Sequence, residues 1–208
     1  MNKQQMLGSV RNYLLHFGRR PNERIIKAME KIDRKNFMDE NKNFAYVDSA
    51  IPIGYGQTIS QPSTVAIMLT LLELKKGDSV LEVGTGSGWN AALISYLITP
   101  GNVQSLEVVH ELAEKAREHI KRQGLENVVI KEDDFRKLKE KFDKIIFTAG
   151  ISEEQEQEIE DFAQRTLKQN GILICPYQNG PLLILKNKRG RIEESYTREG
   201  YIFVPLIL

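Results

Sequence analysis

The sequence of 208 residues has only one cysteine, Cys175, so it can form no internal disulfide bond and no metal site built from several cysteines. The apolar neighbours of this residue, in GILICPY, favour a buried and unreactive thiol over a nucleophile. Long apolar runs are also missing, because none approaches the roughly 18 residues of a membrane span. The N-terminal stretch lacks the unbroken apolar core of a signal peptide. We therefore expect a cytoplasmic protein that does not bind a membrane.

A strong charge of either sign is absent as well. The 29 Lys/Arg and 28 Asp/Glu residues leave a net charge of +1, which gives no electrostatic reason to expect a nucleic-acid partner. The three histidines play no part in the motifs described below, and no metal ion is expected. Hydrophobic residues make up 41% of the chain, enough for a sizeable core. This length and composition are typical of one soluble domain, and we expect a monomer.

The first third of the chain shows helical rather than strand patterns. Residues 2–18 and 22–32 are predicted to form two helices. Residues 33–59 mix aromatic and turn residues, and we expect them to be irregular. A further helix is predicted after Ser60, which we assign as its N-cap, with Pro62 in the first turn where a missing amide hydrogen is tolerated.

From residue 79 onward, short apolar runs alternate with helical patterns. Strands are predicted at SVLEVG, NVQSLEV, NVVIK, KIIFTA, GILICP, LLILKN, RIEES and YIFVPLI, and helices at residues 90–98, 111–123 and 153–168. Such alternation predicts an α/β protein with a mainly parallel, doubly wound sheet covered on both faces. The tight turn at residues 187–190 predicts antiparallel C-terminal strands. We expect residues 1–78 to form a covering N-terminal segment and residues 79–208 the sheet core of one compact domain.

The stretch VLEVGTGSGWN places Gly84, Gly86 and Gly88 where the first predicted strand turns into a helix. Glycine allows backbone angles that a side chain forbids, and it lets backbone amides approach a ligand closely. The carboxyl end of a strand in such a sheet is also where ligands bind. A glycine loop at this junction therefore predicts a cofactor site.

The spacing of the glycines distinguishes between cofactors. A dinucleotide-binding fold has Gly-x-Gly-x-x-Gly, and the third of those glycine positions is Trp89 here. A triphosphate-binding loop would continue with Gly-Lys-Ser/Thr, which is absent. Gly-x-Gly-x-Gly after an acidic strand end instead resembles the first motif of S-adenosylmethionine-dependent methyltransferases. This resemblance implies their Rossmann-like fold.

Two further strand ends carry acids that suit such a cofactor. Glu107 ends the second predicted strand, about 20 residues after the loop, where its carboxylate can accept hydrogen bonds from both hydroxyls of a ribose. Asp133 follows the third strand, in KEDDF, where it could reach an adenine amino group. These positions predict the ribose and adenine ends of the site.

A polar stretch, GYGQTISQPS at residues 54–63, places Gln57, Thr58 and Ser60 just before a predicted helix. The longer IPIGYGQTISQPST resembles the Gly-x-Gly-Gln-Thr-Ile-Ser-x-Pro signature of protein-L-isoaspartate (D-aspartate) O-methyltransferases. The stretches YVDSAIPIG, VLEVGTGSGWNAA, EVVHELAEKA and FVPL are also similar to that family. The resemblance extends from about residue 20 to the C-terminus.

The resemblance implies an enzyme that uses S-adenosyl-L-methionine to methylate the free α-carboxylate of L-isoaspartyl and D-aspartyl residues, which initiates repair of damaged proteins. Those damaged proteins or peptides would be its partners. The resemblance assigns Ser60 as the catalytic residue. The implied cofactor site combines the glycine loop, the acidic strand ends and the polar stretch: Gln57, Thr58, Ile59, Gly84, Thr85, Gly86, Gly88, Glu107, Val108, Asp133 and Asp134.

This reaction would explain why the polar stretch carries no charge. A free α-carboxyl group titrates near pH ~3.5, so the nucleophile is already ionised at neutral pH and needs no general base. Catalysis then consists of aligning the carboxylate oxygen, the methyl carbon and the sulfur. Thr58, Ser60 and nearby helix N-terminal amides can orient a carboxylate, whereas a tight pair with Arg or Lys would reduce its nucleophilicity.

Some positions depart from the pattern of the family. Glu132-Asp133-Asp134 replaces Gly-Asp-Gly beside the adenine, and TAGIS at residues 148–152 replaces an Ala-rich turn. Two alternatives stay open for this reason. One is a related methyltransferase that acts on another carboxylate or a small molecule, and the other is a cofactor-binding protein without turnover. The intact polar stretch argues against the second.

Overall fold

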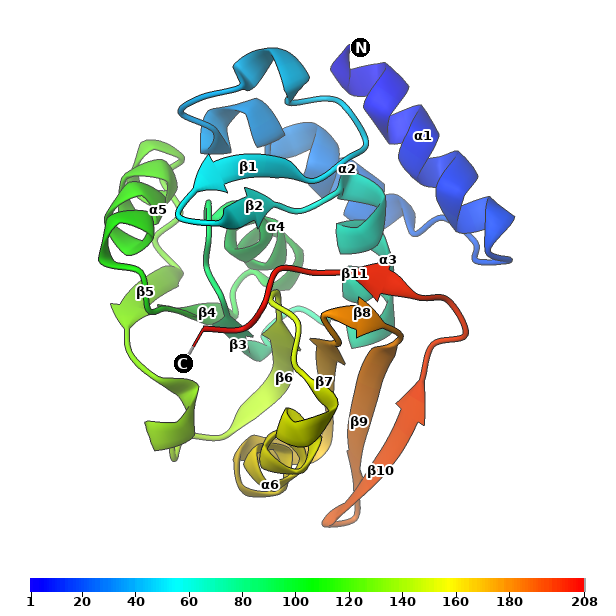
Figure 1. Ribbon diagram of the computed structural model, residues 1–208, viewed down its shortest axis with the longest axis vertical. Helices are drawn as coiled ribbons and strands as arrows, with labels where there is room; N and C mark the ends of the chain where they lie inside the picture. Colours follow the sequence, from blue (N-terminus) through cyan, green and yellow to red (C-terminus); the bar gives the residue numbers. More distant parts are fainter. Residues whose placement is uncertain (208) are drawn as a thin grey trace.

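A seven-stranded sheet forms the centre of the computed structural model, which describes residues 1–207 (Figure 1). Its order is β10-β9-β7-β6-β3-β4-β5. The strands are β3 (Ser79–Val83), β4 (Asn102–Glu107), β5 (Val128–Glu132), β6 (Phe142–Phe147), β7 (Leu167–Pro176), β9 (Leu182–Lys188) and β10 (Arg191–Tyr196). Strands β3 to β7 pair in parallel, whereas β9 and β10 add to one edge in antiparallel orientation. The predicted mainly parallel sheet with antiparallel C-terminal strands is confirmed.

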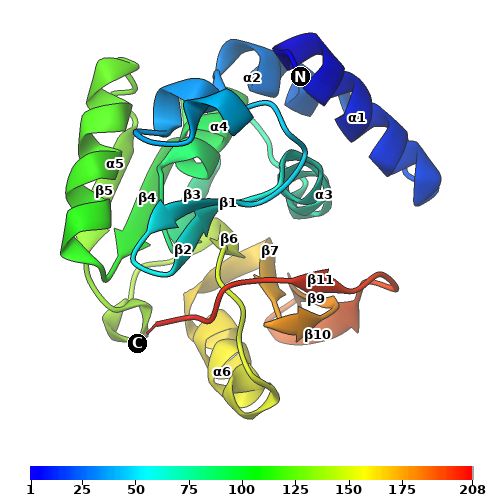
Figure 2. The ribbon, with the colours of Figure 1, turned by 45° about the horizontal axis from the view of Figure 1, so that its top comes forward.

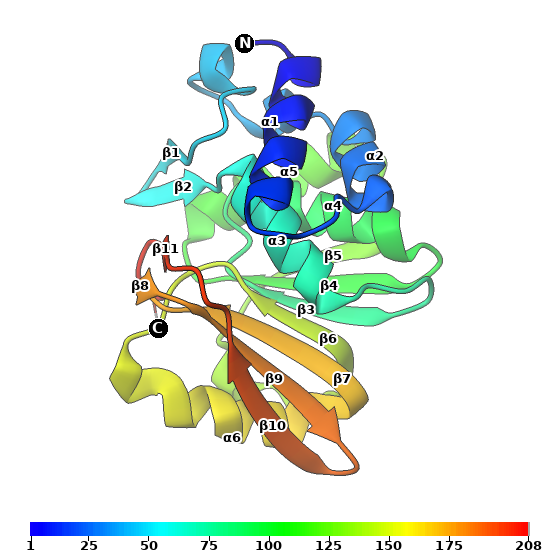
Figure 3. The ribbon, with the colours of Figure 1, turned by 90° about the vertical axis from the view of Figure 1, so that its right-hand side faces the viewer.

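Helices cover both faces of the sheet, because alternate residues of each strand point to opposite sides and both sets are apolar. The helices are α3 (Pro62–Leu72), α4 (Trp89–Ile98), α5 (His110–Arg122) and α6 (Glu156–Thr166). Val80 faces the core shared with α3, α4 and α5, and its neighbour Leu81 faces the core beneath α6. Figure 3 shows α6 on the other side of the sheet from α3 and α4. Cys175 is fully buried in the second core, and burial raises the pKa of its thiol, as expected for an unreactive cysteine.

The N-terminal elements pack over α3 and α4. They are α1 (Lys3–His16), α2 (Glu23–Lys31), the short 3₁₀ helices η1 (Arg34–Phe37) and η2 (Lys42–Phe44), and the strands β1 (Ile51–Gly54) and β2 (Gln57–Ile59). β1 and β2 form an antiparallel hairpin, so the expectation that this region is wholly irregular is wrong. Gly54, Tyr55 and Gly56 all have positive φ angles, which permits the tight turn between the strands. The boundary at residue 78 between cover and core stays a prediction.

Two boundaries differ from the sequence-based expectation because tertiary contacts decide them. The predicted helix over residues 153–168 begins with a 3₁₀ turn, η4 (Glu153–Gln155), and ends at Thr166. Leu167 already pairs with Phe142 of β6, so β7 starts without a loop. The last predicted strand, YIFVPLI, is a strand only at β11 (Tyr201–Ile202), which pairs with β8 (Asn179–Gly180).

Two segments meet above the carboxyl ends of β3, β4 and β6, as Figure 2 shows. We call residues 38–60, which include the β1–β2 hairpin, the cover segment, and residues 203–207 the C-terminal segment. The C-terminal segment is held by backbone hydrogen bonds from Gly150 to Val204 and from Leu206 to Gly150, each 2.8 Å long. Among residues 1–207, no helix is both long enough and apolar enough to span a membrane.

Candidate active site

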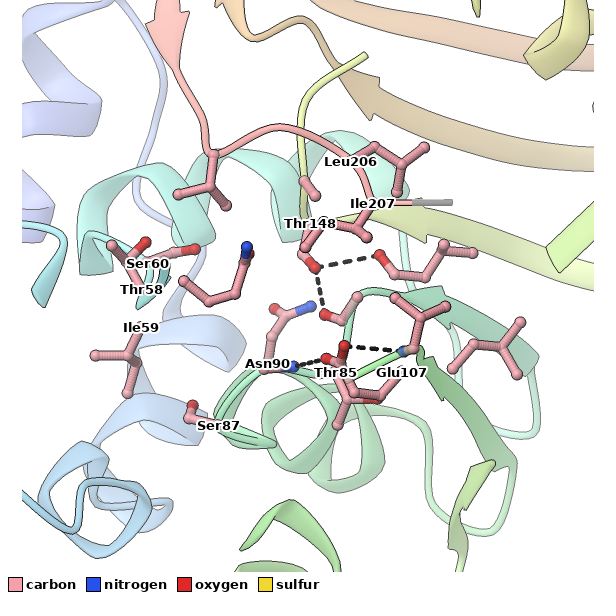
Figure 4. Close-up of a pocket in the computed structure, with 18 of the residues that line it drawn as sticks. Thr58, Ile59, Ser60, Thr85, Ser87, Asn90, Glu107, Thr148, Leu206 and Ile207 are labelled. Atoms are coloured by element: carbon pink, nitrogen blue, oxygen red, sulfur yellow. Dashed lines mark hydrogen bonds between the residues drawn. The ribbon is translucent and has the colours of Figure 1, made fainter. Parts of the chain in front are cut away.

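A cavity lies where the cover segment and the C-terminal segment meet over the sheet (Figure 4). β3 has β4 on one side and β6 on the other, so the chain order reverses at this point, which is where ligands bind in open α/β sheets. We call this space the main cavity. Eleven of the twelve residues predicted from the sequence line it: Gln57, Thr58, Ile59, Ser60, Gly84, Thr85, Gly86, Glu107, Val108, Asp133 and Asp134.

The glycine loop has backbone angles that favour glycine, and close packing adds a second constraint at Gly84. Gly84 has φ +96°, and a Cβ there would lie 2.5 Å from Oγ1 of Thr148. The Thr148 hydroxyl donates a hydrogen bond to the Gly84 carbonyl oxygen and connects β6 to the loop. Gly86 has φ +52°, and a Cβ there would meet Ile53 of the cover segment at 3.6 Å. The loop is therefore packed against β6 on one side and the hairpin on the other.

Gly88 is the one predicted residue that does not line the main cavity. It is the N-cap of α4, has φ +83°, and a Cβ there would lie 3.4 Å from the Cβ of Ala116 in α5. Trp89, which follows it, is buried and donates from Nε1 to the carbonyl oxygen of Ile32 at 3.1 Å. The end of the loop thus serves the packing of α4, α5 and the N-terminal region.

Glu107 supports the glycine loop from β4. Its Oε2 accepts a hydrogen bond from the Gly86 amide at 2.8 Å, and its Oε1 accepts from the Val108 and Val109 amides at 2.9 and 3.1 Å. The side chain is 6% exposed and borders the main cavity. One carboxylate therefore holds the backbone in place both after β3 and after β4. Oε1 thus uses both of its lone pairs, whereas Oε2 keeps one for a ligand hydroxyl.

A buried network below the loop was not predicted as part of the site. Glu82 accepts hydrogen bonds from Ser105 Oγ at 2.5 Å and from Asn90 Nδ2 at 2.8 Å. Burial raises the pKa of Glu82 to about 7, although both hydrogen bonds lower it. The side-chain nitrogen of Asn90 is hydrogen-bonded to Glu82, and its other polar atom, Oδ1, lies on the opposite side of the amide group. Within residues 1–207, Oδ1 has no hydrogen-bond partner. Figure 4 shows Asn90 at the main cavity.

The acids that replace Gly-Asp-Gly are largely paired. Glu132 does not line the main cavity, and it forms ion pairs with His110 at 2.7 Å and Arg117 at 2.6 Å. Asp134 forms an ion pair with Arg136, whose hydrogen bonds lower the pKa of this carboxyl group. Asp133 is 3.8 Å from Lys137 and keeps 37% of its side chain exposed at the cavity. Asp133 is therefore the acid of this stretch that is best placed for a ligand.

The expectation that Ser60 is a helix N-cap is wrong. Helix α3 begins at Pro62, and its N-cap residue is Gln61. The Gln61 side chain caps no backbone amide of the helix within residues 1–207, although it accepts a hydrogen bond from the Thr64 hydroxyl at 3.4 Å. Instead, the carboxylate of Asp48 accepts hydrogen bonds from the Ser63 amide at 2.9 Å and the Ser63 hydroxyl at 2.5 Å. One amide of the helix N-terminus is thus already occupied. The Ser60 hydroxyl is left for another role.

Ser60 lies where the main cavity meets a second, more open space. This outer groove is lined in part by Tyr13, Gln61, Asn179 and residues 200–204. Thr58, Ser60, Thr148 and Val204 line both the main cavity and the outer groove. In Figure 4 the hydrogen bonds lie around Thr148 and Glu107, whereas the side chains of Thr58 and Ser60 reach the cavity without one. The two spaces therefore communicate beside two hydroxyl groups that form no side-chain hydrogen bond within residues 1–207.

Arg34 shapes the cover segment, although no sequence motif pointed to it. The side chain is fully buried, and its guanidinium lies 5.5 Å from the ring centre of Trp89. Burial lowers the pKa of Arg34 to about 10, and the negative charge of Asp48 opposes this shift. The two terminal nitrogens donate to five carbonyl oxygens at 2.9 to 3.2 Å, those of Ala45, Val47, Ser49, Ile59 and Ser60. One side chain therefore fixes the path of the polar stretch.

The C-terminal segment was likewise missed as part of the site. Residues 204–207 all line the main cavity. Gly150 lies in TAGIS, one of the stretches that differ from the family pattern, and its backbone is hydrogen-bonded to this segment. A Cβ at Gly150 would lie 2.6 Å from the Gln178 backbone. The glycine is therefore required by close packing. The match of FVPL to a family pattern was the one available signal for this segment, and it did not indicate a position at the cavity.

Comparison with known proteins gives a consistent result. The model of the family described as protein-L-isoaspartate(D-aspartate) O-methyltransferase matches residues 1–207. A protein-L-isoaspartate O-methyltransferase of Fervidobacterium nodosum is 42% identical over 192 residues, which cover 88% of this chain and 93% of that protein. The protein of the same name from Methanothrix thermoacetophila is 36% identical over 215 residues and covers 100% of this chain and 95% of its own.

Two solved structures have the same fold over nearly the whole chain. One, named protein-L-isoaspartate O-methyltransferase, has a TM-score of 0.83 and 26% identity, and the match covers 98% of this chain and 65% of that one. The other, from Plasmodium falciparum, was determined in complex with S-adenosyl-L-homocysteine. It has a TM-score of 0.81 and 24% identity, with 100% of this chain and 99% of that chain covered.

Proposed function

The chain belongs to the protein-L-isoaspartate(D-aspartate) O-methyltransferase family, and we propose on that premise that it methylates the free α-carboxylate of L-isoaspartyl and D-aspartyl residues in damaged proteins. The methyl donor is S-adenosyl-L-methionine, which supplies a methyl group on a cationic sulfur. The product is a methyl ester, the first step of repair. The monomeric state expected from the sequence stays a prediction. The cytoplasmic location expected from the sequence stays a prediction.

One observation carries the proposal: Thr58 and Ser60 border both spaces. A cofactor in the main cavity and a peptide carboxylate in the outer groove would meet beside these two hydroxyl groups. The outer groove is open along residues 200–204, which suits a substrate that is part of a longer chain. A small-molecule acceptor would have no need of this open side.

The lining of the main cavity fits an adenosyl cofactor. Oε2 of Glu107 is placed to accept a hydrogen bond from a ribose hydroxyl, and Asp133 to accept one from an adenine amino group. The loop from Gly84 to Gly86 offers backbone that a side chain would otherwise cover. The uncommitted Oδ1 of Asn90 adds an acceptor that suits a cationic amino group.

The chain's own contribution to the reaction is alignment rather than proton transfer. Among the residues that line the two spaces in the described part of the chain, none is Lys, Arg or His. An ionised carboxylate therefore meets only neutral donors, which can orient it and leave it nucleophilic. Because Asp48 occupies the Ser63 amide, we assign the orienting role to the side chains of Thr58 and Ser60 rather than to the helix N-terminus.

The proposed function predicts a difference between two peptides that have the same composition. Purified protein is incubated with methyl-labelled S-adenosylmethionine and either an isoaspartyl peptide or its normal aspartyl counterpart. We expect base-labile label on the isoaspartyl peptide alone, because only this peptide presents a free α-carboxylate at that residue. Equal labelling of both peptides would contradict the specificity, and labelling of neither would contradict the activity on isoaspartyl residues.

Replacing Ser60 by alanine should lower kcat by roughly 10- to 100-fold, the order of loss expected when reacting atoms are poorly aligned. Binding of S-adenosylhomocysteine should change less than about threefold, because Ser60 orients the acceptor and not the cofactor. Steady-state kinetics and calorimetry measure the two effects. Ser195→Ala, at an exposed position of β10, is the matched control and should behave as the unaltered protein. A Ser60→Ala enzyme with full kcat would show that the hydroxyl has no part in catalysis.

A further inference from the structure

A buried histidine outside the proposed reaction connects the cover segment to the glycine loop. His119 lies on α5, and 3% of its side chain is exposed. Its Nδ1 is 2.9 Å from the carbonyl oxygen of Ser87, which lines the main cavity. Its Nε2 is 3.2 Å from Oδ1 of Asp39 in the cover segment. The ring of Phe37 packs against it edge-on, with 5.8 Å between ring centres. One imidazole thus bridges the floor and the cover of the main cavity.

The two partners determine the protonation of this ring. A carbonyl oxygen can only accept a hydrogen bond, so Nδ1 of His119 carries a hydrogen in this contact. An ionised carboxylate oxygen also only accepts, so Nε2 carries one as well. A neutral imidazole has a hydrogen on one nitrogen only, so both hydrogen bonds can form together only when the ring is the imidazolium. If Nε2 lost its proton, two acceptors would face each other, and the contact with Asp39 would be lost while the contact with Ser87 remained.

Both acidic and basic side chains surround the bridge. Asp39 and Glu40 face His119 from the cover segment, and Lys115 faces it from α5. Burial raises the pKa of Asp39, but the hydrogen bond and charge of His119, together with Lys115 and Arg122, bring it below its usual value. Of these types of group, only an imidazole ordinarily changes charge between about pH 5 and 8. The contact between His119 and Asp39 therefore depends on the proton on Nε2.

The His119 contacts lie next to the point where the cover segment packs against the glycine loop. Ile53 of β1 covers Gly86. Lys115 Nζ lies 5.9 Å from the ring centre of Tyr55 at the tip of the hairpin, and Figure 1 shows α5 next to that tip. The same hairpin carries the residues that line the main cavity from above, Gln57, Thr58 and Ile59. Release of Asp39 would therefore loosen the segment that encloses a bound cofactor.

We propose that His119 is a positioning residue whose protonated form holds the cover segment against the glycine loop and so closes the cofactor site. The inference rests on the proposed function only for the cofactor and does not depend on the identity of the methyl acceptor. Affinity for S-adenosylhomocysteine is highest where His119 is protonated and falls as the pH rises and the ring becomes neutral. Binding at the higher pH is then coupled to uptake of a proton by His119.

The test is calorimetric titration of S-adenosylhomocysteine into the full chain between about pH 5.5 and 8.5, the range in which histidine titrates. The Kd of the wild type should rise about two- to fivefold across this range, the effect of one half-exposed ion pair. His119→Gln, which has no charge to lose, should show a flatter profile. In buffers of different ionisation enthalpy, the wild type should take up protons on binding at high pH, and the variant should take up fewer.

Two further variants keep the test decisive. In Asp39→Asn, the amide can accept from a protonated ring and donate to a neutral one, so the contact survives and the part of the pH dependence that comes from His119 should disappear. The part that comes from Glu82, whose pKa is about 7, should remain. This variant alters an exposed partner and decides the question even if His119→Gln folds poorly. His16→Gln, on α1, should keep the wild-type profile. If the Kd changed with pH in the same way in the wild type and in all three variants, the proposal would be wrong. If the wild type did not bind S-adenosylhomocysteine at any pH, the cofactor assignment itself would be wrong.

Discussion

Replacing Arg34 by methionine is expected to lower the free energy of unfolding by about 3 to 5 kcal/mol, the loss typical of breaking a buried polar network. Methionine has a similar length and no charge, but it cannot donate to the carbonyl oxygens that the guanidinium holds. Buried acceptors without partners are costly, and two of these acceptors are the carbonyl oxygens of Ile59 and Ser60. The variant should therefore also lose activity, because the polar stretch no longer has a fixed path. Urea unfolding followed by circular dichroism measures the first effect.

Two other variants distinguish the effect of the several hydrogen-bond donors of Arg34 from the effect of its positive charge. Arg34→Lys keeps a positive charge but has three donors on a single nitrogen, so its stability should lie between the wild type and Arg34→Met. Arg165→Met, which removes an arginine that donates one hydrogen bond to a carbonyl oxygen at the surface, should cost less than about 1 kcal/mol. Arg34→Met with the urea midpoint and slope of the wild type would show that the hydrogen bonds of Arg34 contribute nothing net to stability.

Replacing Glu107 by glutamine should raise the Kd of S-adenosylhomocysteine by about 100-fold, because charge-assisted hydrogen bonds are each worth about 1.5 to 3 kcal/mol. The carboxylate accepts from the Gly86 amide with one oxygen and from the Val108 and Val109 amides with the other. In glutamine, one of these oxygens becomes an NH₂ group that faces a donor. The variant loses part of the loop support and an acceptor for the ribose at the same time. Calorimetry with S-adenosylhomocysteine measures the result.

Glu111→Gln is the matched control for this prediction. It removes the same charge from the first turn of α5, at an exposed residue that does not line the main cavity. Its affinity for S-adenosylhomocysteine should stay within about twofold of the wild type, because exposed charges act weakly over distance. If Glu107→Gln bound as tightly as Glu111→Gln, Glu107 would have no role in holding the cofactor.

The cofactor side of the candidate site could be predicted because its residues lie at strand ends. Gly84 and Asp133 follow β3 and β5, Glu107 ends β4, and the carboxyl ends of parallel strands meet at one edge of the sheet. Recognition of alternating strands and helices was therefore enough to bring these residues together. Gly88 shows the limit of this reasoning, because the same glycine pattern serves helix packing at its last position.

Expectations that rested on a local pattern alone were less reliable. A serine two residues before a helix suggests an N-cap, but Asp48 provides the hydrogen bonds to the first turn of α3 from 15 residues earlier in the chain. The apolar run at the C-terminus suggests a strand, but beyond Ile202 the segment turns across the main cavity and bonds to Gly150. In both cases a long-range partner replaced the local one.

The sequence by itself determined the alternation of strands and helices from β3 to β7, the glycine turn after β3 and the acids at the following strand ends, because short-range periodicity and backbone freedom specify these features. Only the tertiary structure decided that Arg34 collects five carbonyl oxygens, that His119 joins Asp39 to Ser87, and that the C-terminal segment encloses the site. The acceptors in these contacts include backbone carbonyl groups, which every residue has and no sequence pattern marks. Their positions become known only once the chain has folded.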